Sequence, residues 1–144
     1  MALKDLRDFI KLLELHGELT RVREEVDWNL EMGAIIRHCY DTGAPAALFE
    51  KVKGHPKGFR ALGASLGPSR IPGHSLYARI ALAFGLSPDA TPQEIMNYYL
   101  QRKEKPIKPV TVKSGPCKEN ILLGKDVDLL KFAEIGRASC RERV

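Results

Sequence analysis

Short apolar runs in the middle of the chain alternate with longer, helically spaced patterns on either side. The segment Ala46–Ser65 contains two such runs, and a connection that includes Gly54, Pro56 and Gly58 separates them. Aromatic and aliphatic runs bounded by glycine and proline are typical of strands, and the proline can continue neither strand. The pattern predicts two central strands against which the flanking helices pack.

The segment before these strands predicts a helix and a short strand. Apolar residues recur at i, i+3, i+4 and i+7 from Leu6, which gives one apolar stripe over about residues 5–16. Asp5 is the expected N-cap and Gly17 the expected stop. A strand from Leu19 to Val22 or Val26 follows, and its mixed charges favour an edge position.

A second helix is expected between this strand and the central pair. Asp27 and Asn29 are its expected caps, and Gly43 ends it before Pro45. Its expected buried side consists of Leu30, Ile35, Ile36 and Cys39.

Two further helices follow the central strands. The third is expected over about Ser75–Phe84, and its expected buried residues are Leu76, Ile80, Ala83 and Phe84. The fourth begins with the sequence Thr91-Pro-Gln-Glu94, a capping box with proline at the first helical position, and reaches Leu100. Its expected buried residues are Ile95, Tyr98 and Tyr99.

These elements predict a mixed α/β fold in which about four helices surround a small central sheet. The expected core includes Phe9, Ile35, Leu48, Phe49, Leu62, Ile80 and Phe84. The predicted domain covers residues 1–101, a linker covers 102–133, and a separate tail covers 134–144. Within the linker, Val110–Val112 has the composition of a short strand.

The composition narrows the class of protein. A chain of 144 residues with 44% hydrophobic and 28% charged residues is expected to form one globular domain. No apolar run approaches the roughly 20 residues that a membrane span needs, and the N-terminus has no apolar signal region. The three cysteines, Cys39, Cys117 and Cys140, are odd in number and lack metal or redox spacing. They favour a reducing compartment, so a cytoplasmic location is expected.

The net charge of +5 raises the possibility of nucleic-acid binding. The positive charge is spread along the chain, with one local cluster at Arg102, Lys103, Lys105 and Lys108. Because this cluster lacks aromatic residues and contains prolines, it is interpreted as a solvated linker, and no nucleic-acid partner is expected.

No residue qualifies as catalytic, cofactor-binding or metal-binding. His38 and Cys39 are adjacent on a helix and point about 100° apart, so Cys39 is interpreted as a core residue. The sequence Gly63–Arg70 lacks the Gly-Lys-Ser/Thr ending of a phosphate loop, and Pro68 removes one N–H donor. The histidines are scattered over different elements: His16, His38, His55 and His74.

Taken in order, several segments resemble the N-terminal region of UbiD-type decarboxylases, and most closely the fungal ferulic/cinnamic acid decarboxylase branch. The matching segments are Leu6–Phe9; Asp27, Glu31 and Ile35; Ala47–Phe49; Phe59–Ala64; Leu82 and Leu86; Thr91–Ile95; Ser114–Asn120; and Asp128 with the two leucines after it. The similarity extends from about Leu3 to Phe132, and Gly115–Asn120 is its most specific part.

The resemblance implies a reversible, non-oxidative decarboxylation of an aromatic or α,β-unsaturated carboxylic acid. It also implies a full-length homo-oligomeric enzyme that uses prenylated FMN, a divalent metal such as manganese, and potassium. The family's Glu-Arg-Glu network and its cofactor ligands lie downstream of this region, so the fragment itself is expected to be inactive. The charged residues Arg23, Glu24 and Glu25 lie in the first strand and are not assigned to that network.

The last residues depart from the family. The sequence Glu134–Val144 resembles a translated sequencing-library adapter, and its composition lacks an apolar stripe that could dock on a core. Two functional hypotheses remain. The chain is either the N-terminal part of a prenylated-FMN decarboxylase or a stand-alone basic binding or scaffolding module.

Overall fold

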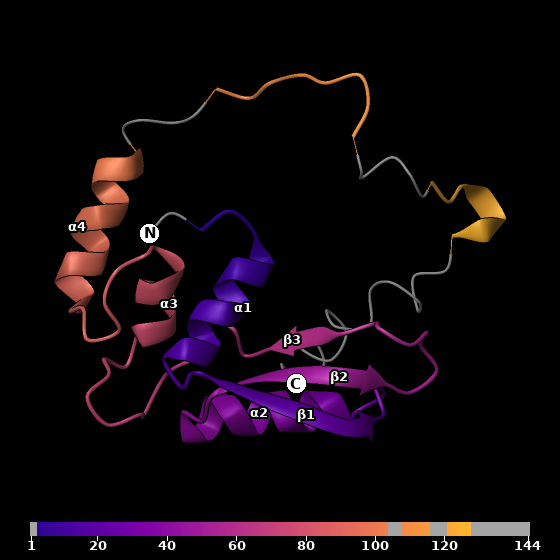
Figure 1. The fold of residues 1–144 in the computed structure, drawn as a ribbon, viewed down its shortest axis with the longest axis horizontal. Coiled ribbons are helices and arrows are strands. Elements are labelled where there is room, and N and C mark those ends of the chain that lie inside the picture. Colours follow the sequence, from indigo (N-terminus) through magenta and orange to yellow (C-terminus); the bar gives the residue numbers. More distant parts are fainter. Residues whose placement is uncertain (1–2, 104–107, 116–120, 128–144) are drawn as a thin grey trace.

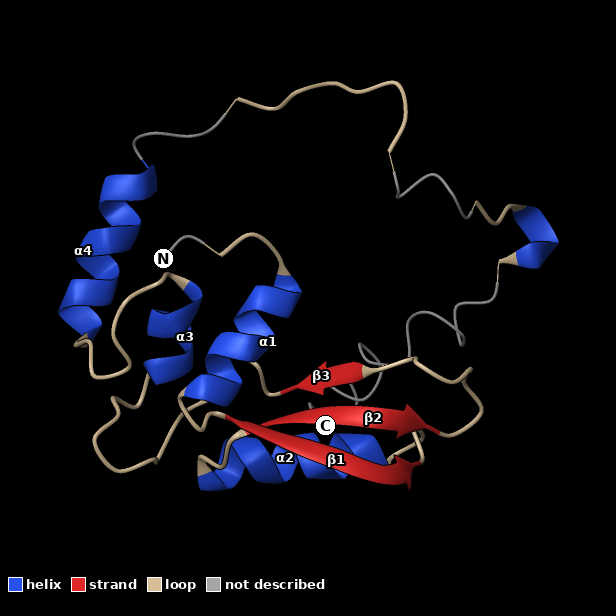
Figure 2. Cartoon of the chain, in the orientation of Figure 1, coloured by secondary structure: helices blue, strands red, loops and turns tan. Residues whose placement is uncertain are grey.

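The computed structural model describes residues 3–103, 108–115 and 121–127, which form a small three-stranded sheet with helices on both faces (Figures 1 and 2). The elements in chain order are α1 (Leu6–Leu15), β1 (Leu19–Val26), α2 (Glu31–Thr42), β2 (Ala46–Val52), β3 (Ala61–Gly63), α3 (Ala78–Ala83), α4 (Pro92–Lys103) and a 3-10 turn (Gly124–Asp126). The mixed α/β prediction, with four helices around a small sheet, is confirmed.

The sheet has the strand order β1-β2-β3, so only β2 is central. β1 and β2 are parallel, and α2 provides the crossover that a parallel pair requires. β3 is antiparallel to β2, with Leu48 opposite Leu62. The edge position predicted for β1 is confirmed, whereas the prediction that both strands of Ala46–Ser65 are central is wrong. Within the described residues β3 pairs with β2 alone, so it forms the second edge of the sheet.

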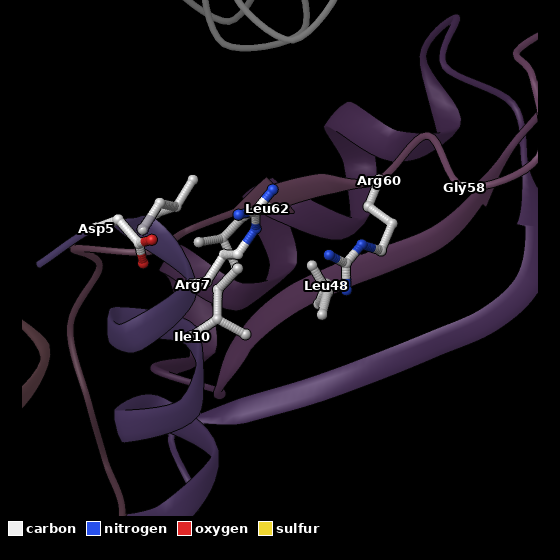
Figure 3. Close-up of a pocket in the computed structure, with 8 residues that line it drawn as sticks. Asp5, Arg7, Ile10, Leu48, Gly58, Arg60 and Leu62 are labelled. Carbon is white, nitrogen blue, oxygen red and sulfur yellow. The ribbon is translucent and has the colours of Figure 1, made fainter. Parts of the chain in front are cut away.

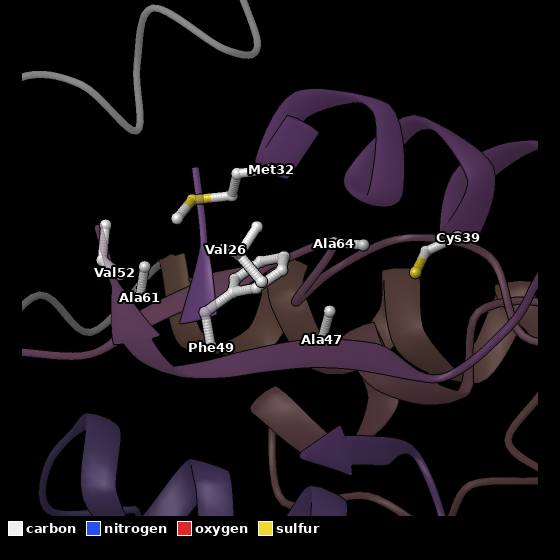
Figure 4. Packing of buried hydrophobic residues seen from close by; sticks show 8 residues of the cluster. All are labelled: Val26, Met32, Cys39, Ala47, Phe49, Val52, Ala61 and Ala64. Atoms are coloured by element: carbon white, nitrogen blue, oxygen red, sulfur yellow. The ribbon is translucent and has the colours of Figure 1, made fainter. Parts of the chain in front are cut away.

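One face of the sheet packs against α2 (Figure 4). Met32 and Cys39 of α2 lie on the same side as Phe49 and Val26, and Phe49 is completely buried. The approach of α2 is close at Gly63, because a Cβ atom there would lie 2.3 Å from Ile36 Cγ1. Ile35 and Ile36 pack at the margin of this cluster and are partly buried.

The opposite face packs against α1 and α3. Phe9 and Leu13 of α1 form a buried cluster with Ala46 of β2 and Leu82 of α3, and Leu62 lies partly buried at its edge. A third cluster joins α3 to α4 through Ala81, Ala90 and Ile95. Successive residues of β2 point to opposite faces of the sheet, and both faces are covered by helices. The first four residues of β2 are therefore all buried, which agrees with its continuous apolar sequence.

The helix ends confirm several sequence signals. Asp5 accepts a hydrogen bond from the Asp8 amide at 3.0 Å, and Gly43 ends α2 in the left-handed conformation. Both hydrogen bonds of the capping box are present. The Thr91 amide donates to the Glu94 carboxylate at 2.7 Å, and the Glu94 amide donates to the Thr91 hydroxyl at 3.3 Å.

The start of α2 differs from the prediction. Leu30 occupies the N-cap position with φ 75°, makes no side-chain cap and is 64% exposed, so its predicted burial is wrong. Asp27 instead accepts from the amide of Asn29 at 2.9 Å, and its own amide donates to Glu31 at 2.8 Å. The two carboxylates therefore stabilise a turn that precedes the helix.

The third helix is shorter than expected and buries a different side. α3 begins at Ala78, and its buried residues are Ala78, Arg79, Ala81 and Leu82. Leu76 is exposed, while Ile80, Ala83 and Phe84 are partly buried. A buried arginine explains the error, because hydrophobic periodicity assigns such a residue to the solvent side.

Other predictions concern the region after α3. In α4, which continues to Lys103, Ile95 is buried, Tyr98 is partly buried and Tyr99 is exposed, so the expected burial of Tyr99 is wrong. Val110–Val112 is not a strand. The predictions for residues 134–144 lie outside the described residues, and the division into domain, linker and tail stays a prediction. No helix in the described part of the chain has the length and apolar character to cross a bilayer.

Candidate functional site

Cys39 is a core residue, as the sequence predicts. Its side chain is buried against the α2 face of the sheet, while His38 is exposed on α2. Burial raises the pKa of the Cys39 thiol, which disfavours the nucleophilic thiolate. The two residues therefore do not form a catalytic pair.

The loop after β3 uses several of its backbone amides for hydrogen bonds within the protein. Three of these amides are engaged: Gly67 N donates to Ala64 O at 3.0 Å, Ser69 N to Leu76 O at 2.9 Å, and Arg70 N to Gly43 O at 3.0 Å. A phosphate loop needs such amides free and converging on the anion. These internal bonds agree with the interpretation of Gly63–Arg70 as a turn.

The loop instead contributes to a buried polar cluster, which the sequence analysis missed. We define the Glu18 cluster as Glu18, Ser69, His74 and Arg79, which come from the residue before β1, the loop after β3 and α3. Glu18 and Arg79 are both 0% exposed. Glu18 Oε1 accepts from Ser69 Oγ at 2.6 Å and lies 2.7 Å from His74 Nδ1. Its Oε2 lies 3.4 Å from Arg79 Nε, within ion-pair range.

Arg79 links this carboxylate to three backbone carbonyls. Its Nη1 donates to Ala64 O at 2.9 Å, and its Nη2 donates to Ala44 O at 2.8 Å and to Pro68 O. Burial lowers the pKa of the guanidinium, while the charge of Glu18 opposes that shift. The fork of Arg79 therefore holds the ends of two loops against α3 around a charge-balanced pair.

The Glu18 cluster contains serine, histidine and carboxylate, but its geometry is not that of a nucleophilic triad. In such a triad the histidine receives the proton of the serine and is itself oriented by the carboxylate. Here Ser69 and His74 both contact the same oxygen of Glu18, so the serine proton is directed to the carboxylate. The serine is also buried, at 3% exposure. The cluster is thus suited to joining structural elements rather than to attacking a substrate.

The remaining histidines and charged residues do not converge on a site. No group of three His, Cys, Asp or Glu side chains within residues 3–103, 108–115 and 121–127 could hold a metal ion. His16 lies with its ring centroid 6.3 Å from that of His74, whereas His55 stacks on Phe59 in the connection after β2. Arg23, Glu24 and Glu25 are exposed along β1. In the basic region, Arg102 lies 4.9 Å from the ring centroid of Tyr98.

Sequence reasoning missed the Glu18 cluster because its members are separated by up to 61 positions and share no motif. One signal was present. Glu18 directly follows the helix-ending Gly17 and directly precedes the strand, a position at which a side chain can turn inward. Its burial depends on Arg79, and no local pattern indicates that partner.

Comparison with known proteins places the chain beside a group of decarboxylases. The family of the 3-octaprenyl-4-hydroxybenzoate carboxy-lyase N-terminal domain (UbiD_N) matches residues 10–99. Pyrrole-2-carboxylic acid decarboxylase of Pseudomonas aeruginosa is 40% identical over 131 residues, which cover 89% of this chain and 26% of the relative. Ferulic acid decarboxylase 1 of Saccharomyces cerevisiae is 42% identical over 129 residues, which cover 87% of this chain and 25% of that protein.

Solved structures agree with this comparison. The closed form of the vanillic acid decarboxylase ShVdcCD of Sedimentibacter hydroxybenzoicus superposes with a TM-score of 0.70 and 31% identity, and the match covers 91% of this chain and 26% of that one. The chain thus spans about a quarter of the length of these relatives.

Proposed function

The chain belongs to the UbiD carboxy-lyase family through its N-terminal domain, and we propose that it is the N-terminal part of a prenylated-FMN-dependent decarboxylase. The proposed reaction is the reversible, non-oxidative decarboxylation of an aromatic or α,β-unsaturated carboxylic acid. The observation that carries the proposal is the breadth of the match, since 89% of this chain aligns at 40% identity with a decarboxylase of that kind.

The described residues do not fit the family's cofactors. The amides of Gly67, Ser69 and Arg70 in the loop after β3 are engaged within the protein, and the described residues offer no group of three metal-binding side chains. The proposal therefore assigns prenylated FMN, the divalent metal and potassium to the part of the enzyme that follows this region. When bound there, prenylated FMN supplies an electron sink for the departure of carbon dioxide. This domain contributes a folded support, joined internally by the Glu18 cluster.

A paired assay tests the proposal. The 144-residue chain and the longer product of the same locus are each produced together with a flavin prenyltransferase, purified, and compared by flavin absorbance and by decarboxylation of cinnamic-type acids. We expect the longer protein to retain the flavin and release carbon dioxide, and the short chain to do neither above a no-enzyme control. The reason is that catalysis needs a cofactor held beside positioned acid and base groups.

Two outcomes would contradict the proposal. Decarboxylation by the short chain would refute the assignment of the chemistry to the downstream region. A locus that encodes no flavin domain would instead favour the stand-alone basic binding or scaffolding module.

A further inference from the structure

The helix α4 is attached to the domain along a narrow strip. In Figure 1 it stands at one end of the domain beside α3, and Ile95, its one buried residue, packs with Ala81 and Ala90. The ring centroid of Tyr98 lies 5.8 Å from that of Phe84. Because a helix of this length is stabilised mainly by packing an apolar face on its neighbours, contact through so few residues leaves α4 incompletely covered.

The uncovered part of α4 is an apolar stripe, and we define the α4 stripe as Met96, Tyr99 and Leu100. The spacing of i, i+3 and i+4 puts the three side chains on one side of the helix. Their exposed fractions are 53%, 48% and 49%. Lys103, at i+7 from Met96, lies on the same side and is also exposed. The α4 stripe therefore ends beside a positive charge.

The other flank of α4 is polar. Glu94, Asn97 and Gln101 border a hollow of about 450 Å³, together with Ser87 and Asp89 of the preceding loop. Polar side chains on that flank are suited to contact with water, whereas those of the α4 stripe are not. An exposed apolar patch beside polar residues commonly marks a surface that binds another part of a protein.

The groove between α1 and the approach to β3 has a different character (Figure 3). Its volume is about 430 Å³, and its lining mixes apolar side chains with charged ones of both signs, Asp5, Arg7 and Arg60. Such a mixed lining favours no single partner chemistry. The α4 stripe is apolar along its length, so it indicates the chemistry of the surface that would cover it.

The position of the α4 stripe along the chain indicates where that surface comes from. Among the described residues, nine of the sixteen exposed large hydrophobic side chains lie from Met96 onward, although most of the described residues precede it. Beyond α4 they include Val110, Ile121 and Leu123, which are 83%, 64% and 73% exposed. The structural match to the vanillic acid decarboxylase covers 91% of this chain, which is more than the residues up to Lys103 would account for. The uncovered apolar residues thus accumulate where the chain leaves the folded domain.

From these observations we propose that the α4 stripe docks on an apolar surface of the downstream part of the longer enzyme, with a carboxylate of that part near Lys103. The inference rests on the proposed function, because the match covers only 26% of the relative and the occupant belongs to the remainder. A covalent connection favours this occupant over a second copy, since a partner tethered by a short linker has an effective concentration of roughly millimolar.

Methionine oxidation tests whether the α4 stripe is covered. Met96 is 53% exposed, whereas Met32 is 2% exposed and serves as an internal control in the same protein. The 144-residue chain and the longer product of the locus are each treated with dilute hydrogen peroxide, which oxidises an accessible thioether to the sulfoxide, and the peptides are quantified by mass spectrometry. We expect Met96 to oxidise roughly tenfold more slowly in the longer protein, while Met32 resists oxidation in both. Equal rates for Met96 in the two proteins would refute the proposed contact.

The same measurement distinguishes the downstream part from a second copy of the chain. Oxidation of Met96 in the short chain is repeated over a wide range of protein concentration, and we expect its rate to stay constant. A rate that falls as the concentration rises would assign the α4 stripe to a contact between copies and overturn the proposal.

Two double variants test which side of α4 makes the contact. M96E/L100E adds two charges to the α4 stripe, and N97E/Q101E adds the same charges, at the same spacing, to the polar flank. Hydrogen exchange at the α4 amides is measured in the longer protein and in the short chain. We expect exchange to be roughly tenfold slower in the longer protein, and to return to the rate of the short chain in M96E/L100E but not in N97E/Q101E. An equal effect of the two double variants would overturn the proposal.

These readouts are independent of decarboxylation. A longer protein that protects Met96 but has no activity would contradict the proposed function alone. An active longer protein in which Met96 stays as reactive as in the short chain would contradict this inference alone.

Discussion

The buried ion pair between Glu18 and Arg79 predicts a large stability loss in the variant E18Q. Glutamine can keep one oxygen toward Ser69 and His74, but its amide nitrogen then replaces Oε2, which lies 3.4 Å from Arg79 Nε. The amide N–H of the glutamine then faces the Nε–H of Arg79, and the buried guanidinium loses its counter-charge. Removing one partner of a buried ion pair costs about 3–5 kcal/mol, and the retained hydrogen bonds place this variant near the lower end, at about 3 kcal/mol.

A matched substitution on the surface isolates the effect of burial. Glu14 also pairs with an arginine, and its two oxygens accept from Arg21 at 2.6 and 2.9 Å, but its side chain is 47% exposed. The bond to Arg21 lowers the pKa of Glu14, yet water screens this pair and can solvate Arg21 when the carboxylate is removed. E14Q should therefore unfold at nearly the same urea concentration as the parent protein.

Urea titration followed by circular dichroism measures both variants. With a slope of about 2 kcal/mol per molar urea, a loss of about 3 kcal/mol lowers the midpoint by about 1.5 M. Such a loss is a large part of the roughly 5–15 kcal/mol that stabilises a typical domain. If E18Q lowers the midpoint by less than about 0.5 M, or by no more than E14Q does, the Glu18 cluster does not stabilise the fold.

Three other predictions concern separate parts of the fold. Phe49 is completely buried between the sheet and α2, so F49A should cost roughly 3–5 kcal/mol, and a loss below about 1 kcal/mol in the same titration would contradict its place in the core. Burial raises the pKa of Cys39, so iodoacetamide at pH 8 should alkylate this thiol only after unfolding, as peptide mass spectrometry would reveal; rapid labelling of the native protein would refute this. Hydrogen bonds from the Thr91 amide and hydroxyl lower the pKa of Glu94. The ionised carboxylate therefore stabilises the start of α4 fully at pH values above the ordinary pKa of 4.5, and this stabilisation is lost as the pH falls through the lowered pKa. T91A should cost ~1 kcal/mol at pH 7 and should weaken that pH dependence; an unchanged dependence would show that the capping box is not its source.

Predictions based on local chemistry agree with the structure. Asp5 and the pair Thr91 and Glu94 satisfy the amides at their own helix ends, so sequence spacing of three residues is enough to recognise them. The apolar run of β2 was equally informative, because a strand covered on both faces needs no polar alternation. In each case the residues that determine the structure lie within one element.

Predictions failed where the decisive contact is distant in sequence. Arg79 is buried because Glu18 balances its charge and carbonyls from two loops accept its hydrogen bonds, and no pattern within α3 indicates those partners. Leu30 was expected inside because it is apolar, but Asp27 and Glu31 shape the turn before α2 and leave Leu30 at the exposed N-cap.

The buried residues that stabilise this domain lie apart from the region to which the proposal assigns decarboxylation. All three apolar clusters and the Glu18 cluster lie within residues 3–103, whereas the described residues beyond them are exposed apart from the partly buried Gly115. A substitution in the Glu18 cluster acts on the folding equilibrium, while the residues that would carry decarboxylation belong, by the proposal, to the region that follows. In the longer enzyme, E18Q should thus reduce the fraction of folded protein and leave kcat per bound flavin unchanged. A variant that lowered kcat per flavin instead would mean that this domain positions the catalytic groups directly, and the support role assigned to it would have to be abandoned.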